Sequence, residues 1–342
     1  MEFPVYILIA LVIMGLAEAI YLAWTGRTYS LNISVSNISC GVFSLCTKIF
    51  YTGGFALVYT MLQSQLGLTR AFGWQWWSLL LTFELVDLIY YAYHRMAHRV
   101  ALLWGAHVVH HQSEEYNLTV SLRQDSIGVL AATPFYLIPA LIGIPLPVFI
   151  AMNGLFQLYQ FFVHTALVRN MGFLERVIST PRLHQLHHAR NVEYIDCNYS
   201  GFLILWDRLF GTYRPPSVEP LFGVTQPISS WSPVWANFGY FHELYLKCRR
   251  RRGWNRLFTL IGPPEWKPSS EAENKKPYVS YLNQPSHGWT ATAVIVVLMS
   301  ISVSFLLAAK ANHWDATINL TVACVTATMA WFATRLFDGR RI

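Results

Sequence analysis

The 342-residue chain has few charged side chains: Asp, Glu, Lys and Arg together make up only 13% of it. This is about half of the roughly 25% that is usual in soluble domains. Hydrophobic residues make up 54%, and the mean hydropathy is +0.34. These values exclude a disordered chain and a coiled coil, and they argue strongly against a water-soluble globule. The composition therefore indicates a membrane protein with several spans.

Acidic residues are the scarcer charged class, with 18 Asp and Glu against 25 Lys and Arg, which gives a formal net charge of +7. In a soluble protein this excess could indicate binding to nucleic acid. In a membrane protein it is explained more simply by basic residues kept on the cytosolic side and near anionic headgroups. We therefore expect a bilayer, and no nucleic acid, as the partner of these charges.

Cysteine is also sparse: the five residues are scattered, odd in number and without CxxC spacing. This pattern argues against a disulfide framework and against a cysteine-type zinc site. The chain contains neither of the glycine-rich nucleotide-binding motifs GxGxxG and GxxxxGK[ST]. Reducing equivalents for any redox reaction must therefore come from a separate redox partner or from a small diffusible cofactor.

Seven hydrophobic runs are predicted to be membrane spans. They cover residues 4–24, 41–63, 76–93, 127–143, 146–166, 289–309 and 316–334. The first lacks a basic n-region and a small-residue cleavage site, so it is predicted to be an uncleaved span. Prolines interrupt the fourth and fifth runs, and Pro145 and Pro147 predict the tip of a hairpin between them.

Basic residues predict the orientation of these spans, because they flank the polar segments and include the run KCRRRR at 247–252. With these residues in the cytosol, the N-terminus lies outside, the C-terminus lies inside, and residues 168–288 form a cytosolic cap. Within the cap, 262–288 is predicted to be a linker. Four units follow: N-terminal spans 1–75, a core 76–215, a cap and linker 216–288, and a C-terminal hairpin 289–342.

Histidine is the residue that the chain has in unusual number, and nine of its 12 histidines lie between positions 94 and 188. Eight occur in the motifs HRMAH, HVVHH and HQLHH, and one in FFVHT. They are His94, His98, His107, His110, His111, His164, His184, His187 and His188. Spacings of three and four residues place side chains on one helix face, so two rings of one helix can reach one metal ion.

A lone histidine in an apolar protein is usually a satisfied polar residue, and one HxxxH motif would not change that interpretation. Repeated motifs that follow hydrophobic spans differ, because polar groups are costly to desolvate there. Imidazole suits iron, zinc and copper, whereas magnesium and calcium prefer oxygen. Nine rings exceed one coordination shell and indicate two metals. We therefore predict an all-α, multi-span integral membrane helical bundle with a cytosolic, histidine-rich di-metal cap.

Three polar residues near these motifs are candidate supports of the site. Asp87 lies in the third span, where an unpaired charge costs roughly 2.5–3.5 kcal/mol, and precedes His94 by two helical turns. We hypothesise that it accepts a hydrogen bond from a ligating imidazole; a structural pair with Arg or Tyr is the alternative. Glu114 could bring a carboxylate near the metals or lie in a solvated turn. Asn117 could hydrogen-bond a substrate headgroup or a ligand.

Histidines at a membrane–cytosol boundary place a redox metal where a lipid chain can reach it. Two irons can activate O₂ toward an unactivated C–H bond, while the protein fixes the ligands, excludes water and positions one methylene. A non-catalytic metal-binding or transport protein is the alternative from another class. Transport predicts polar or acidic residues at mid-depth in several spans, and only the third span has them.

The pattern HxxxH, HxxHH, H, HxxHH over roughly residues 80–215 resembles the fatty acid hydroxylase/sterol desaturase superfamily of membrane di-iron oxygenases. Within it, the chain is more similar to the alkylglycerol monooxygenases, in the phrases YYAYHRMAH, HVVHHQSEEYNLTVSLRQ, LYQFFVHT and STPRLHQLHHARNVEYIDCNYSGFLILWDRLFGTY. Sterol desaturases usually continue the second motif with a Pro- and Phe-rich phrase, and this chain has SEEYNLTVSLRQ there.

The resemblance implies that the nine histidines hold two irons, which zinc could replace during purification. It implies a lipid substrate, O₂, and tetrahydrobiopterin or another electron donor. The reaction would hydroxylate the ether-linked carbon of an alkylglycerol and release a fatty aldehyde and a glycerol or glyceryl lipid. A sterol or fatty-acyl hydroxylase or desaturase of the same superfamily is the alternative.

The resemblance also implies a compartment: the endoplasmic reticulum membrane in a eukaryote or the cytoplasmic membrane in a bacterium, with the active site facing the cytosol. One position departs from the pattern. The relatives carry Glu directly after the second histidine of the first motif, where this chain has Arg99. If that Glu takes part in pterin handling, the electron donor of this chain stays open between a pterin and a protein partner.

Overall fold

The computed structural model describes residues 5–26, 30–227, 230–269, 271, 278, 280, 290–311 and 313–337. Within these ranges the backbone forms helices and loops, and its only β-type pairings are isolated bridges that join Ile178 to Leu203 and Ala189 to Phe222. The prediction of an all-α protein is confirmed. The predicted linker 262–288 falls largely outside the described residues.

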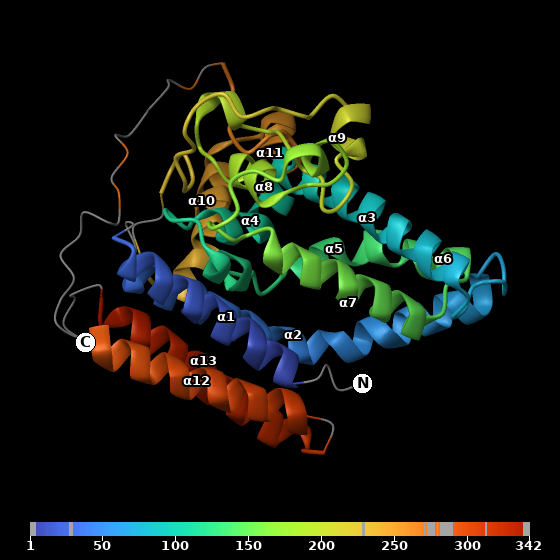
Figure 1. Cartoon of the computed structure of the whole chain (residues 1–342), viewed down its shortest axis with the longest axis horizontal. Coiled ribbons are helices and arrows are strands. Elements are labelled where there is room, and N and C mark those ends of the chain that lie inside the picture. The colour runs from blue at the N-terminus through green and yellow to red at the C-terminus, as the bar shows by residue number, and fades with distance from the viewer. Residues whose placement is uncertain are drawn as a thin grey trace.

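The helices follow one another along the chain in an order that Figure 1 shows by colour. The α-helices are α1 (Val5–Trp24), α2 (Leu31–Leu66), α3 (Trp76–Arg99), α4 (Ala101–His111), α5 (Gly128–Tyr136), α6 (Ile138–Ile142), α7 (Leu146–Phe162), α8 (Pro181–His187), α9 (Leu205–Leu209), α10 (Pro233–Arg250), α11 (Gly253–Ile261), α12 (Thr290–Lys310) and α13 (Ala316–Arg335). Three short 3₁₀-helices are η1 (Leu118–Leu122), η2 (Gly172–Arg176) and η3 (Val192–Tyr194).

Three helices of the described chain are long and apolar enough to cross a membrane, namely Leu31–Leu66, Ala291–Lys310 and Ala316–Arg335. They correspond to the second, sixth and seventh predicted spans. The segments Ala10–Trp24, Gly128–Ile142 and Leu146–Phe162 are shorter apolar helices. The multi-span membrane character is therefore confirmed, whereas the count of seven spans, the orientation and the four domain boundaries stay predictions.

Residues 127–143 do not form the single helix that was predicted. Helix α5 ends at Tyr136, and α6 begins two residues later. Pro139 has no N–H to donate, so it interrupts the hydrogen-bond ladder at this point. The predicted hairpin tip is confirmed: Gly143 ends α6 at φ +107°, and Pro145 is the N-cap of α7.

Helix α2 begins ten residues before the predicted span at 41–63, because its polar N-terminal turns are buried against protein. The side chain of Asn37 donates to Ser113 and Thr119, and Ser36 donates to the Trp231 carbonyl. The polar side chains that lower the hydropathy of this segment therefore find hydrogen-bond partners in η1, in the loop before it and at Trp231. The helix continues to Leu66.

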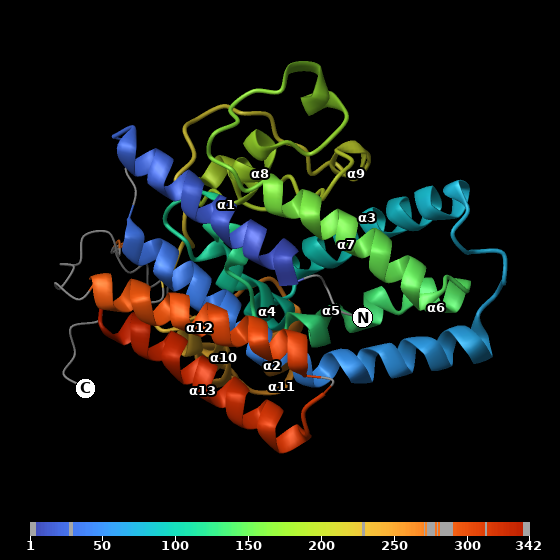
Figure 2. The ribbon, with the colours of Figure 1, turned by 60° about the horizontal axis from the view of Figure 1, so that its bottom comes forward.

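Helix α2 connects two hydrophobic cores. Its first half packs against the α12–α13 hairpin, where Ile38 and Val42 meet Val297 and Ala330. Its second half extends beyond that hairpin toward α6 (Figure 2) and buries Tyr59 in the core of α3, α6 and α7. Helices α8 and α9 lie on the side of α3 and α7 away from the α12–α13 hairpin (Figures 1 and 2), whereas α10 contacts α13 as well as α2 and α4. The histidine motifs lie on α3, α4 and α8 and in the turn after α7.

Candidate metal centre

The nine predicted histidines lie in two adjoining groups. The first histidine group consists of His94, His98, His107, His111 and His187, and the second of His110, His164, His184 and His188. Within each group one nitrogen of every ring lies within 4.8 Å of those of the others. The rings of His111 and His188, one from each group, are 4.3 Å apart between centroids. The structure thus brings together all nine residues and separates them into two sites.

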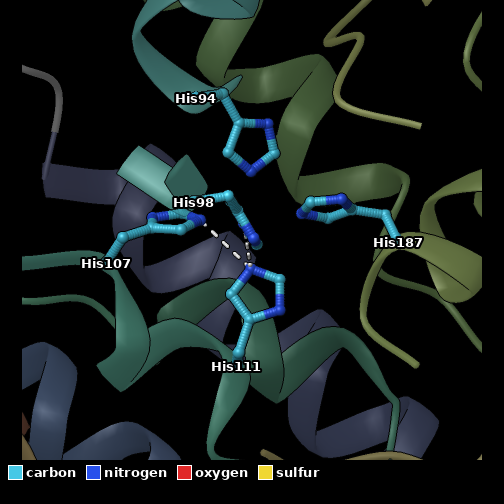
Figure 3. A group of neighbouring side chains, drawn as sticks. All are labelled: His94, His98, His107, His111 and His187. Carbon is cyan, nitrogen blue, oxygen red and sulfur yellow. Dashed lines mark hydrogen bonds between the residues drawn. The ribbon is translucent and has the colours of Figure 1, made fainter. Parts of the chain in front are cut away.

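In the first histidine group, rings from three helices point toward a common centre (Figure 3). Helix α3 supplies His94 and His98, α4 supplies His107 and His111, and α8 supplies His187. The Nε2 atom of His111 lies 3.2 Å from Nε2 of His98 and 3.1 Å from Nε2 of His107. Because α3 and α4 are separated only by Val100, the two helices meet at an angle and direct these rings to one point.

The second histidine group has the same character. Its rings come from α4, from α8 and its C-cap, and from the turn after α7. The Nε2 atom of His164 lies 3.1 Å from Nε2 of His110 and 3.2 Å from Nε2 of His184, and His188 Nε2 is 3.3 Å from His184 Nε2. His110 and His111 are consecutive, yet they serve different groups, and so do His187 and His188.

These distances fit ligands of a transition metal. For metal–nitrogen bonds of about 2.1 Å, nitrogens at right angles around a metal lie about 3.0 Å apart and opposite ones about 4.2 Å apart. The observed contacts of 3.1–3.3 Å lie close to the right-angle distance. The limit of 4.8 Å within each group exceeds the distance between opposite ligands, so the outermost nitrogens would move slightly inward around a bound metal. Nitrogen-only sites of this kind suit iron, zinc or copper rather than magnesium or calcium.

Backbone carbonyls orient four of the rings. The Nδ1 atom of His94 donates to the Tyr199 carbonyl, and Nδ1 of His187 donates to the Cys197 carbonyl, each at 2.9 Å. In the second group, Nδ1 of His110 and of His164 donate to the carbonyls of Arg123 and Gln160. A proton held on Nδ1 leaves the Nε2 lone pair free for a metal.

The Nε2 atoms of His94 and His187 are buried and have no hydrogen-bond partner among the residues that the structure describes. Burial lowers the pKa of His187 and of His110 to about 4, so both rings are neutral at physiological pH. Neutral imidazole is the form that binds metals. A buried polar atom without a partner is costly, and a bound metal ion would remove that cost.

The buried carboxylate of Asp207 holds the segment that supports the first group. Asp207 accepts hydrogen bonds from the N–H groups of Tyr199 and Ser200 and from the Thr212 hydroxyl. Arg99 forms an ion pair with Asp196 beside this segment. The phrase after the third motif therefore packs back onto the site, and Gly211, at φ +72°, directly follows the C-cap residue of α9. The importance of Asp207 was not foreseen from the sequence.

The hypothesis for Asp87 is wrong. Its carboxylate accepts hydrogen bonds from the N–H groups of Phe202 and Leu203 and from the Trp206 indole, and not from an imidazole. Seven residues of helix separate Asp87 from His94, a rise of about 10 Å, which is too far for that contact. Asp87 instead fixes the backbone just after Tyr199.

Glu114 and Asn117 also have other roles than the predicted ones. Glu114 accepts hydrogen bonds from Tyr278 and Ser280, and it is in neither histidine group. Asn117 caps η1 by accepting from the backbone N–H and the hydroxyl of Thr119. Both residues therefore fix the chain between α4 and η1, next to the histidine groups.

Arg123, one of the basic residues that flank the polar segments, is buried. Its guanidinium donates to the Val109 carbonyl, to Ser36 and Asn37 of α2, and to Gln112. Its own carbonyl accepts from His110. A buried guanidinium satisfied by oxygen acceptors rigidly links α2, α4 and the second histidine group, and sequence alone offered no signal for it.

Gly201 allows its backbone to pack closely against the rings of Phe156 and Tyr90, next to the first histidine group. A Cβ at this position would meet the rings of Phe156 and Tyr90, with the Tyr90 contact at 2.8 Å. We therefore expect Gly201→Ala to destabilise the protein by about 1–3 kcal/mol, as overpacking of a core usually does. Thermal unfolding in detergent measures the effect. Gly53→Ala, in the interior of α2 with nothing within 4 Å of an added Cβ, is the control: it should leave the midpoint unchanged or raise it slightly, because Ala favours a helix over Gly.

A cavity of about 380 Å³ reaches both histidine groups, within the usual size range of ligand sites. His94, His107, His110 and His164 form one part of its wall. Apolar and aromatic side chains from α2, α5 and α7 form much of the rest, including Phe55, Phe149 and Phe161. A flexible apolar chain in this cavity would have one of its carbons beside the imidazoles.

A helical membrane protein with two buried histidine groups in the wall of a largely apolar cavity has the features expected of a membrane metalloprotein. Comparison with known proteins agrees. The fatty acid hydroxylase family model matches residues 79–212, which contain all nine histidines. This segment of the chain therefore belongs to the fatty acid hydroxylase family, and the resemblance stated from the motifs is confirmed.

The chain is similar to alkylglycerol monooxygenases of animals. It is 37% identical to the enzyme of Xenopus tropicalis over 75% of this chain and 60% of that protein. The human enzyme is 34% identical over 70% of this chain and 54% of that protein, and that of Danio rerio is 36% identical over 73% and 56%. The matches thus span less than two thirds of these relatives' length. No solved structure matches the chain.

Proposed function

We propose that this protein is a membrane di-iron monooxygenase that uses O₂ to hydroxylate a C–H bond of a lipid, and that this bond is at the ether-linked carbon of an alkylglycerol. The observation that carries the proposal is the pair of histidine groups in the wall of one cavity. The similarity to alkylglycerol monooxygenases supports the choice of lipid. We expect the histidine groups to face the cytosol.

Two irons held by these rings would supply the activation of O₂. The overall reaction inserts one oxygen atom into the C–H bond and reduces the other to water with two electrons and two protons. A reduced pterin is the donor that we propose. The hydroxylated ether is a hemiacetal, which breaks its C–O bond to give a fatty aldehyde and an alcohol.

The protein's own residues have three tasks in this reaction. The carbonyls of Tyr199 and Cys197 hold the rings of His94 and His187 in place. Apolar walls of the cavity keep water away from the chain and align it. Trp104 packs against the rings of His98 and His111 and covers the first histidine group on its other side.

The proposal is tested by assaying the purified, iron-loaded enzyme on alkylglycerol, sterol and acyl-lipid panels, with and without tetrahydrobiopterin. We expect a fatty aldehyde from the alkylglycerol only, dependent on both O₂ and the pterin, and two irons per chain. The variant His242→Ala, at an exposed residue outside both groups, should keep the activity. Hydroxylation or desaturation of a sterol or acyl lipid without pterin would contradict the proposal.

A further inference from the structure

Lys48 is the one charged residue in the 36 residues of α2, and it lies near the middle of that helix. Helix α2 is one of the three that are long and apolar enough to cross a membrane. An ionisable side chain within such a helix is costly, and it usually serves a binding or transport function. The bilayer alone therefore gives no reason for a lysine at this position.

The side chain lies where two cavities meet. Lys48 lines the cavity that reaches the histidine groups, and it also lines a second cavity of about 200 Å³ between α1, α2 and α12. The two cavities share Ser121, Leu122 and Gln124 as well. The walls of the second cavity are mainly apolar, with Val42, Leu45 and Phe305 among them. The cation is thus placed beside space in which a lipid can lie.

Within the described chain, the ammonium of Lys48 takes part in no hydrogen bond and in no ion pair. Asp125, in the wall of the larger cavity, is the acid that its charge influences: burial raises the pKa of Asp125, and Lys48 opposes that rise. The Asp125 carboxylate accepts instead from the N–H of Gly128. The cation is therefore near an acid without being paired to it.

We propose that Lys48 binds the anionic head, a phosphate or a carboxylate, of an alkylglycerol derivative such as an alkylglycerol phosphate, whose ether-linked carbon then lies in the larger cavity beside the histidine groups. An anionic lipid head would neutralise the charge of the poorly solvated Lys48 ammonium. A neutral hydroxyl head could not do so. Gln124 and Ser121 would hydrogen-bond the neighbouring polar atoms of the same head. The inference rests on the proposed function, because it names the substrate class of that site.

The test is a direct binding measurement on the purified, metal-loaded protein in nanodiscs, with hexadecyl phosphate and hexadecanol as matched ligands. A charge-assisted hydrogen bond corresponds to a preference of about 10- to 100-fold for the phosphate. Lys48→Met should abolish this preference by weakening hexadecyl phosphate alone, and Lys48→Arg should keep it. Lys310→Met, at an exposed residue at the end of α12 that lines neither cavity, is the control and should behave as wild type.

Inorganic phosphate is the third ligand of the experiment, and it separates a lipid head from a free anion. We expect it to bind at least 100-fold more weakly than hexadecyl phosphate, because it lacks the chain. Equal binding of the two phosphates would overturn the inference, as would a preference that survives in Lys48→Met or an equal loss of both lipids. Binding is read without turnover, so a protein that keeps the preference but oxidises no ether lipid refutes the proposed function alone.

Discussion

The double variants His98→Ala/His111→Ala and His184→Ala/His188→Ala should each retain one metal ion per chain instead of two. Each removes two imidazoles from one histidine group and leaves the other group complete. Turnover should fall by more than about 100-fold in both, because even a change to a residue that orients a ligand costs 10- to 100-fold. Elemental analysis of the purified proteins gives the metal content, and the aldehyde assay gives the turnover.

A third double variant, His111→Ala/His188→Ala, removes the same number of rings but takes one from each group. It should weaken both metal sites, so that titration with metal shows two weak sites in place of one intact and one lost site. His242→Ala should keep two tightly bound metals. If either of the first two variants lost both metals together, the nine rings would form one shared site and the division into two groups would be incorrect.

The nine histidines could be predicted from the sequence, whereas their division into two groups could not. Motif spacing shows which residues share a helix face, but consecutive residues on a helix are rotated by about 100°. His110 and His111 therefore diverge, and the group that each joins depends on where α3, α7 and α8 pass. That arrangement is set by tertiary packing, which cannot be deduced from a single motif.

The polar supports of the site were predicted less well, for a similar reason. Asp87 was identified as a buried acid, but two of its three partners are backbone N–H groups of residues 202 and 203, more than a hundred positions away. Backbone donors have no residue type and leave no pattern in a sequence. Likewise, the polar first turns of α2 were left out of the predicted span, because a hydropathy window sees only their polarity. The groups that satisfy them, in η1 and at Trp231, lie far away in the sequence. The long hydrophobic runs, which depend on composition alone, were predicted correctly as helical, except that 127–143 is divided into α5 and α6.

Asp207→Asn should weaken the first histidine group and leave the second nearly unchanged. Oδ1 of the buried carboxylate accepts from the Tyr199 N–H and the Thr212 hydroxyl, and Oδ2 accepts from the Ser200 N–H. An amide keeps one acceptor oxygen and places its NH₂ against the donor on the other side. Loss of one charge-assisted hydrogen bond costs roughly 1.5–3 kcal/mol in the free energy of unfolding. The backbone of residues 197–199 would shift, and with it the carbonyls that hold His94 and His187.

We therefore expect metal affinity at the first group to fall by about 10- to 100-fold, with the affinity of the second group within a factor of about two. Metal titration and chemical denaturation of the same preparations measure the two effects. Asp315→Asn is the matched control, because Asp315 is an exposed N-cap of α13 and Asn caps a helix as well as Asp. An Asp207→Asn protein that bound both metals as wild type does would show that the loop carbonyls do not set the orientation of the rings.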